Sequence, residues 1–263
     1  MITSPHSVHK SGARILAVFL ALTSFSQAHV SYSGRDLTPA GGSAVVISNQ
    51  TVSSPFGWAD GTDADWGDSH RLRAFRFTLS YDTDVAISIS ASTNGGAVLG
   101  TLLPAFSIYS GLAHLPPAAL DHDGAVVTVN YLTALGGREG AFRATDTWKM
   151  GSDDGVTDAD LSTFTYVGHM ADGTAANFGN AAGLVGDGLA DGTVSGTFHL
   201  PAGTYSLFVG GADYAAGVGA AAPFSNYGIT TSLQIVPEPA TGLAVACAGF
   251  IALRRRRTAT FAN

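Results

Sequence analysis

Short runs in which apolar and polar residues alternate recur along the chain, separated by clusters of Gly, Asp and Pro. The segments 72–79 (LRAFRFTL, with one slip) and 85–89 (VAISI) are the clearest examples. Alternation with a period of two is typical of a β-strand with one buried face. Because the polar, turn-like segment 81–84 separates these two runs, we predict that residues 72–91 form a β-hairpin.

Similar runs predict further strands at residues 44–48, 105–109, 125–131, 162–168, 193–200, 203–210 and 227–235. Many short strands with turn signals between them indicate an all-β fold, which we predict to be an antiparallel β-sandwich of jelly-roll type. The stretches 136–160 and 171–192 are long and loop-like, so they either carry function or contain elements that the pattern does not show. We expect one short helix at residues 158–163.

The N-terminal end has the pattern of a secretion signal. Lys10 and Arg14 precede an apolar run at 15–25, which is followed by the small residues of Ser26-Gln27-Ala28. A charged region, an apolar region and small residues in this order are typical of a signal peptide that is removed after export. We therefore expect a signal helix within residues 1–28 and cleavage after Ala28.

The C-terminal end carries a different apolar segment. It is the run 240–253, which lacks charged residues and is shorter than the roughly 20 residues of a full membrane span. Clustered arginines beside a span remain in the cytoplasm. We therefore predict a marginal transmembrane helix with the body outside and the arginines inside. The flanking residues are Pro237, Glu238 and Pro239 before the helix, and Arg254, Arg255, Arg256 and Arg257 after it.

A Pro-Glu-Pro motif, a short apolar helix and an arginine cluster in this order resemble the PEP-CTERM sorting signal, and the resemblance covers residues 236–263. In that family, exosortase, a membrane protease related to transpeptidases, recognises and processes the signal. The family's members are surface or extracellular proteins of Gram-negative bacteria that make exopolysaccharide. Together with the signal peptide and the strand pattern, this divides the chain into a signal peptide at 1–28, a β-sandwich body at 29–235 and a sorting signal at 236–263. The resemblance also implies anchoring in the inner membrane before processing and release to the cell surface afterwards.

The composition of the body excludes some classes of function. Between the two ends lie 7 basic and 19 acidic side chains, which give a net charge of −12. Nucleic acid is excluded as a partner because binding phosphates requires a basic surface. The single cysteine, Cys247, belongs to the tail, so the body has no disulfide and no cysteine metal site.

Aspartates gather in the segment Gly57–Ser69 (GWADGTDADWGDS). Calcium takes six to eight oxygen ligands, and a glycine-turned loop rich in aspartate can supply several of them. The sequence thus raises the possibility of a calcium site, although Asp and Gly are also ordinary turn residues. The candidate ligands are Asp60, Asp63, Asp65 and Asp68. Smaller clusters occur at 121–123 and 153–160, and the tetrapeptide Ala-Asp-Gly-Thr occurs at 59–62, 171–174 and 190–193.

Two tryptophans, Trp58 and Trp66, flank this aspartate cluster. Exposed tryptophans beside a calcium loop suit a sugar-binding face, whereas buried ones would only pack over the edge of the sandwich. Stretches at 84–90, 104–111 and 198–211 are similar to bacterial pre-peptidase C-terminal domains and related carbohydrate-binding sandwiches. A calcium-dependent carbohydrate-binding module is therefore the alternative to a plain surface protein.

Catalytic motifs are absent from the sequence. It contains no HExxH zinc motif, no GxSxG nucleophile elbow and no phosphate-binding glycine loop. Glu139 is the only glutamate of the body, so a glycosidase would need a pair of aspartates. We expect a non-enzymatic exported protein of the cell surface or extracellular matrix, with an extracellular hydrolase as the least favoured alternative.

Overall fold

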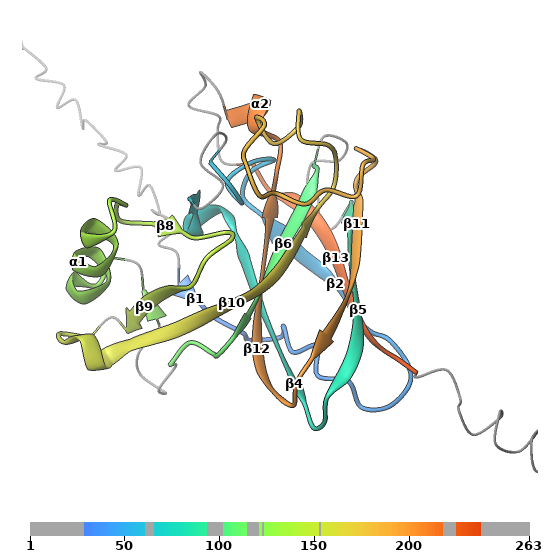
Figure 1. Ribbon diagram of the computed structural model, residues 1–263, viewed down its shortest axis with the longest axis horizontal. Coiled ribbons are helices and arrows are strands. Elements are labelled where there is room, and N and C mark those ends of the chain that lie inside the picture. Colours follow the sequence, from blue (N-terminus) through green and yellow to red (C-terminus); the bar gives the residue numbers. More distant parts are fainter. Residues whose placement is uncertain are drawn as a thin grey trace, which may run out of the picture.

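The computed structural model describes residues 29–60, 66–93, 102–114, 121–122, 124–152, 154–217 and 225–237 of the 263-residue chain. Within these ranges two antiparallel sheets pack face to face, and a small two-stranded sheet lies beside them (Figure 1). The chain is therefore an all-β sandwich, as the alternating pattern predicts. The predicted signal segment and the predicted C-terminal helix lie outside the described residues.

The seven-stranded sheet has the order β1-β7-β9-β10-β6-β12-β4, and the four-stranded sheet has the order β11-β5-β13-β2. The strands of the larger sheet are β1 (His29–Val30), β4 (Arg73–Leu79), β6 (Pro104–Ser110), β7 (Asp121–His122), β9 (Trp148–Ser152), β10 (Leu161–Ala171) and β12 (Gly203–Gly211). Those of the smaller sheet are β2 (Val45–Val52), β5 (Thr83–Ser92), β11 (Thr193–Leu200) and β13 (Tyr227–Val236). The remaining elements are β3 (Gly67–Asp68) paired with β8 (Ala141–Phe142), the helices α1 (Val126–Ala134) and α2 (Tyr214–Gly217), and the 3-10 turns η1 (Ser69–Arg71) and η3 (Asp158–Asp160).

The eight long strands pair in a nested order. β2 pairs with β13, β4 with β12, β5 with β11, and β6 with β10. The first long strand thus lies beside the last, the second beside the second last, and so on inward. This nesting over two sheets is the jelly-roll arrangement.

The predicted hairpin at 72–91 is wrong, although both of its strands form. β4 belongs to the seven-stranded sheet and β5 to the four-stranded sheet, so the turn between them crosses from one layer to the other. The tight connection between β11 and β12 crosses in the same way. These two connections lie side by side, and Asp82 Oδ1 accepts a hydrogen bond from the Ala202 N–H at 2.8 Å. Alternation shows which face of a strand is buried but not which strand lies next to it.

The predicted strand at 125–131 is also wrong, because helix α1 occupies Val126–Ala134. The strand β9, against which α1 packs, already pairs with β7 on one edge and with β10 on the other. Neither edge of β9 is free to pair with a further strand, so helix α1 packs against the face of the sheet instead. Val127 and Thr128 are buried, and the Thr128 hydroxyl accepts a hydrogen bond from the Gly151 N–H at 2.8 Å. Tertiary context thus overrides the strand preference of the β-branched residues.

The seven-stranded sheet is buried on both faces. Its inner face shares a core with the four-stranded sheet, centred on residues such as Phe75, Ile87 and Leu207. Its outer face carries a second, aromatic core, which includes Tyr109, Phe142, Trp148, Phe164 and Phe208. The rings of this outer core meet mostly edge to face at centroid separations of 4.9–6.3 Å.

The segments that cover this outer core were only partly predicted. The loop-like stretch 136–160 contains β8, β9 and η3, of which only the short helix was expected. The η3 turn confirms that helix in its first three residues, and β10 begins directly after it. Since both faces of β6 and β12 are covered, nearly all of their residues are buried, rather than every second one.

Candidate functional site

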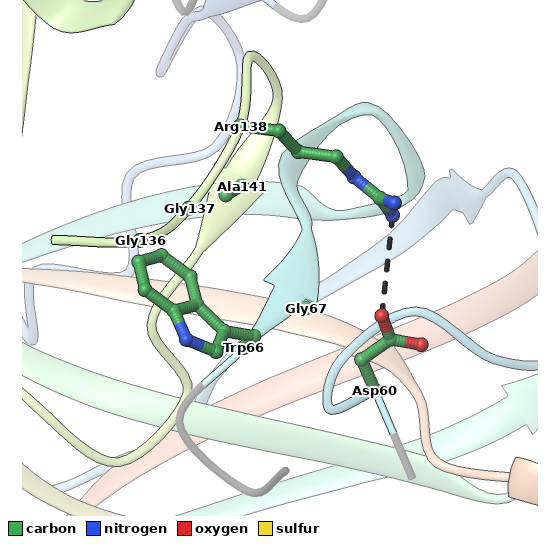
Figure 2. A pocket seen from close by; sticks show the side chains of 7 residues that line it. All are labelled: Asp60, Trp66, Gly67, Gly136, Gly137, Arg138 and Ala141. Carbon is green, nitrogen blue, oxygen red and sulfur yellow. Dashed lines mark ion pairs between the residues drawn. The ribbon is translucent and has the colours of Figure 1, made fainter. Parts of the chain in front are cut away.

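A pocket of about 210 Å³ lies beside the small sheet formed by β3 and β8. Two connections far apart in the sequence build it, one around β3 and the other between α1 and β8. Figure 2 shows Trp66 and Arg138 on opposite sides of this pocket, with the glycine backbone between them. The lining residues are Asp60, Trp66, Gly67, Gly136, Gly137, Arg138 and Ala141.

The indole of Trp66 is held from two sides and remains partly exposed. A side-chain carbon at Gly137 would lie 2.6 Å from Cη2 of the indole, so only glycine permits this close approach. The Arg143 guanidinium lies 5.3 Å from the ring centroid, a cation–π arrangement. The ring is thus fixed in position at the pocket without being buried.

Asp60 and Arg138 provide the charged groups of the pocket. Arg138 Nη2 lies 3.9 Å from Asp60 Oδ2, and the two side chains are 77% and 64% exposed. An ion pair this long and this exposed contributes little to stability. Both groups can therefore exchange partners for a ligand at small cost.

The backbone beneath the pocket is closely fitted. The Asp60 N–H donates to the Trp66 carbonyl, which joins the two ends of the segment 61–65. A side-chain carbon at Gly67 would lie 2.4 Å from the Trp58 carbonyl oxygen, so only glycine fits at this position of β3. These two contacts fix the positions of Asp60 and Gly67 at the pocket.

Asp68, one of the predicted calcium ligands, is already engaged by the protein. Its Oδ1 accepts from the N–H and from Nδ1 of His70, at 3.0 and 2.9 Å, and its Oδ2 accepts from Arg71 Nε at 2.8 Å. Burial raises the pKa of the Asp68 carboxyl, but the hydrogen bond and charge of His70 and the charge of Arg71 outweigh burial and hold the pKa below its ordinary value. A calcium ion at this carboxylate would have to compete with an arginine.

The calcium hypothesis is only partly covered by the structure. Asp63 and Asp65 lie outside the described residues, while Asp60 lines the pocket beside Arg138. No group of three or more His, Cys, Asp or Glu side chains that could hold a metal ion occurs among the residues that the structure describes. Calcium at this segment stays a prediction.

Trp58 is not a surface residue, so its predicted place on a sugar-binding face is wrong. Its side chain is fully buried in the outer core, and Nε1 donates to Ser107 Oγ at 2.9 Å. The Ser107 hydroxyl in turn donates to the Ala144 carbonyl at 2.6 Å. The alternative, packing over the edge of the sandwich, is the correct reading for Trp58.

The repeated Ala-Asp-Gly-Thr tetrapeptide has a structural role that the sequence analysis missed. The carboxylate of Asp172, in the second copy, accepts from the N–H groups of Asp191 and Gly192, in the third copy, at 3.0 and 2.6 Å. Asp172 itself is fully buried. Burial raises its pKa, and the nearby Asp187 and Asp191 add to this, although the two N–H groups act in the opposite direction. The repetition of the tetrapeptide in the sequence was the signal that could have indicated this structural role.

The predicted sorting signal lies almost entirely beyond the described residues. Pro237 is exposed and follows directly on β13, whereas Ala28, Glu238, Pro239 and Arg254–Arg257 fall outside. In the part of the chain that is described, no helix is long and apolar enough to cross a membrane.

Comparison with known proteins gives likenesses of fold only. The sequence matches no protein-family profile and no curated protein. CorA, described as a surface-associated copper-binding protein important in Methylomicrobium album BG8 copper acquisition, shares 14% identity with a TM-score of 0.50, over 78% of this chain and 98% of its own. The Methylococcus capsulatus secreted protein MopE, in which an oxidized tryptophan facilitates copper binding, shares 15% identity with a TM-score of 0.43, over 81% of this chain and 93% of its own. The likeness to CorA shows a related β-sandwich.

Proposed function

We propose that this chain is an exported, non-enzymatic protein of the cell surface or extracellular matrix, and that its body binds polysaccharide at the Trp66 pocket. The signal peptide would direct export, and exosortase would process the PEP-CTERM-like tail after a period of anchoring in the inner membrane. The observation that carries the binding role is a fixed, partly exposed indole beside two weakly paired charged side chains.

The chemistry of this pocket suits a sugar ring. An indole offers an apolar face to the C–H groups of a pyranose, while a carboxylate and a guanidinium accept from and donate to its hydroxyls. The volume of about 210 Å³ is small for a drug-sized ligand and matches a single sugar unit of a longer chain. Concave sites with one aromatic wall and a few convergent polar groups are typical of small-molecule recognition.

The position of the tail supports the sorting role. Because Pro237 is exposed at the end of β13, the signal begins at the surface of the sandwich rather than within its core. A protease in the membrane could reach that point without unfolding the body. The intact mass of the released protein tests this, since processing requires a product that lacks Arg254–Arg257. A released product that retains all four arginines contradicts processing.

The binding role is tested by measuring retention on exopolysaccharide from a producing bacterium. The W66A variant is expected to bind at least about tenfold more weakly than the parent chain, a loss of about 1.4 kcal/mol. Tyr81, which is 57% exposed and lies outside the pocket, provides the matched control as Y81A. Equal retention of W66A and the parent would remove the pocket from the proposal.

A second candidate function is metal binding at the cell surface. CorA, whose fold resembles this one, is described as a surface-associated copper-binding protein. Among the residues that the structure describes, no group of three or more His, Cys, Asp or Glu side chains could hold a metal ion.

A further inference from the structure

Two edge strands meet on one open side of the sandwich. β4 ends the order of the seven-stranded sheet and β2 ends that of the four-stranded sheet, and the two strands contact each other. The segment before β2 runs along the edge of β4 that faces away from β12. There the Arg76 N–H donates to the Arg35 carbonyl at 3.0 Å, and the Leu37 N–H donates to the Arg76 carbonyl at 2.8 Å. This pairing brings Arg35 close to Arg73, the first residue of β4.

The half-buried side chains of Arg35 and Arg73 reach the same short stretch of β2. Arg35 Nε donates to the Ala74 carbonyl at 2.8 Å, and its Nη1 donates to Gln50 Oε1 at 3.3 Å. Arg73 Nε donates to the Thr51 carbonyl at 2.8 Å. The two side chains thus lie between the same neighbouring residues, 73–74 and 50–51. Burial and, after it, the positive charge of Arg73 lower the pKa of Arg35, as expected for like charges that lie close together.

The other arginines of the body each have an aspartate as a partner. The pairs are Arg71 with Asp68, Arg76 with Asp36, Arg138 with Asp60 and Arg143 with Asp146, at nitrogen–oxygen distances of 2.6–3.9 Å. Among the residues that the structure describes, Arg35 and Arg73 form no ion pair. The two arginines without a carboxylate are therefore the two that lie together, in a body whose net charge is −12.

Joining the two sheets does not account for the two charges. A neutral donor such as glutamine could also bond to the carbonyls of Ala74 and Thr51. Two positive charges that are close together and partly buried repel each other and lose part of their hydration. An anion beside them would offset both costs. Arg73 has donors left for it, because neither of its Nη atoms has a hydrogen-bond partner within the described part of the chain.

We propose that Arg35 and Arg73 form a binding site for a tetrahedral oxyanion, of which phosphate and sulfate are the simplest. The planar guanidinium group presents paired N–H donors that match the oxygens of such an anion, and hydrogen bonds to a charged acceptor are stronger than those to a carbonyl. One doubly charged anion balances both arginines. The site shares no residue with the lining of the Trp66 pocket, so it is independent of the proposed sugar binding.

The test is an isothermal titration of the purified protein with sodium phosphate and, separately, with sodium sulfate, both in chloride buffer. We expect one saturable site per chain at low millimolar concentrations for at least one of the two ions. The R73Q variant is expected to bind that ion more than about tenfold more weakly. R76Q is the matched control, because Arg76 lies on the same strand but is already paired with Asp36. It is expected to bind the ion as the parent does.

Melting temperatures provide the second measurement and show that each variant is folded. Phosphate and sulfate stabilise proteins in general, so the rise that they cause in the parent is compared with the rise in R73Q. R35Q, with the same expected loss of binding, tests the site if R73Q does not fold. The site is overturned if the parent shows neither a saturable heat nor a larger rise than R73Q, or if R73Q and R35Q both bind as tightly as the parent.

A competition experiment identifies the source of the anion. The net charge of the body favours a small ion from solution over an anionic polymer. Failure of exopolysaccharide from a producing bacterium to displace bound phosphate or sulfate would support the free ion as the ligand. Displacement in the parent and in R76Q would instead assign the bound oxyanion to phosphate or sulfate groups of the polymer at the same two arginines.

Discussion

Trp58 and Trp66 stand at the two ends of one aspartate-rich segment, and the structure gives them opposite roles. The sequence could not separate them, because each has a glycine beside it and both flank the same aspartates. The deciding contacts come from residues distant in the sequence. Ser107 accepts the hydrogen bond of the buried Trp58, while Gly137 leaves room for the partly exposed Trp66.

These roles predict different costs of removal. W58A is expected to lower the free energy of unfolding by about 3–5 kcal/mol, because it leaves a cavity in a packed aromatic core. W66A is expected to lower it by less than about 1 kcal/mol. Urea unfolding of both variants provides the measurement, and a W66A variant as unstable as W58A would show that Trp66 is also structural.

His169 predicts a dependence of stability on pH. Its Nε2 accepts from the Val185 N–H at 2.8 Å, so the ring proton lies on Nδ1, which is 2.5 Å from the Tyr166 hydroxyl. Burial lowers the pKa of His169 to about 4. Between that value and the ordinary pKa of about 6.5, the unfolded chain binds a proton that the folded chain does not.

The free energy of unfolding should therefore fall as the pH decreases through this window, by about 1 kcal/mol per pH unit. Urea unfolding between about pH 7 and about pH 5 measures the slope. H169A is expected to be less stable at neutral pH and to show a flatter slope, whereas the exposed His199 provides the control as H199A. An unchanged slope in H169A would contradict the assignment.

At the scale of elements, the sequence predicted most long strands but not their partners. The predicted strand at 193–200 coincides with β11, yet β4 and β5, expected as a hairpin, lie in different layers. The periodicity of apolar residues shows which side chains of a strand are buried. It does not show whether the strand that pairs with it comes from the next segment or from the far end of the chain. The same reason explains α1, where a strand-like sequence lacks a free edge to join.

The connection between β10 and β11 depends on one buried carboxylate. The Asp172 carboxylate accepts hydrogen bonds from two backbone N–H groups in the next copy of its own tetrapeptide. The D172A variant therefore leaves both donors without an acceptor. We expect a loss of about 2–4 kcal/mol in the free energy of unfolding and faster proteolysis within 171–192. D158A, at an exposed aspartate of η3, is the control. Equal stability of D172A and the parent would contradict this role.

At the scale of the whole molecule, the net charge limits which kinds of polysaccharide the proposed pocket can bind. A body with a net charge of −12 repels anionic polymers over distances that salt shortens. Binding of a neutral polysaccharide at the Trp66 pocket should change by less than about twofold between about 20 and about 500 mM NaCl. Binding of an anionic one should strengthen with salt. Retention that falls steeply with salt would point to a cationic surface as the binding determinant.

The whole candidate pocket could be predicted only in part. Trp66 and Asp60 stood out because they lie in a conspicuous segment. Gly137 and Arg138 come from a stretch without chemical motifs, and they reach the site only because β8 pairs with β3. A site assembled by pairing between distant loops leaves no pattern in either loop alone.

The nested pairing of the long strands also sets an order of events during synthesis. β2 is made early, but its partner β13 is the last of the strands that the structure describes. The four-stranded sheet therefore cannot close until almost the whole chain has been made. If the chain is exported as proposed, a chain that stays open for this long can still be threaded through a membrane channel, and it completes its fold only once β13 has been made.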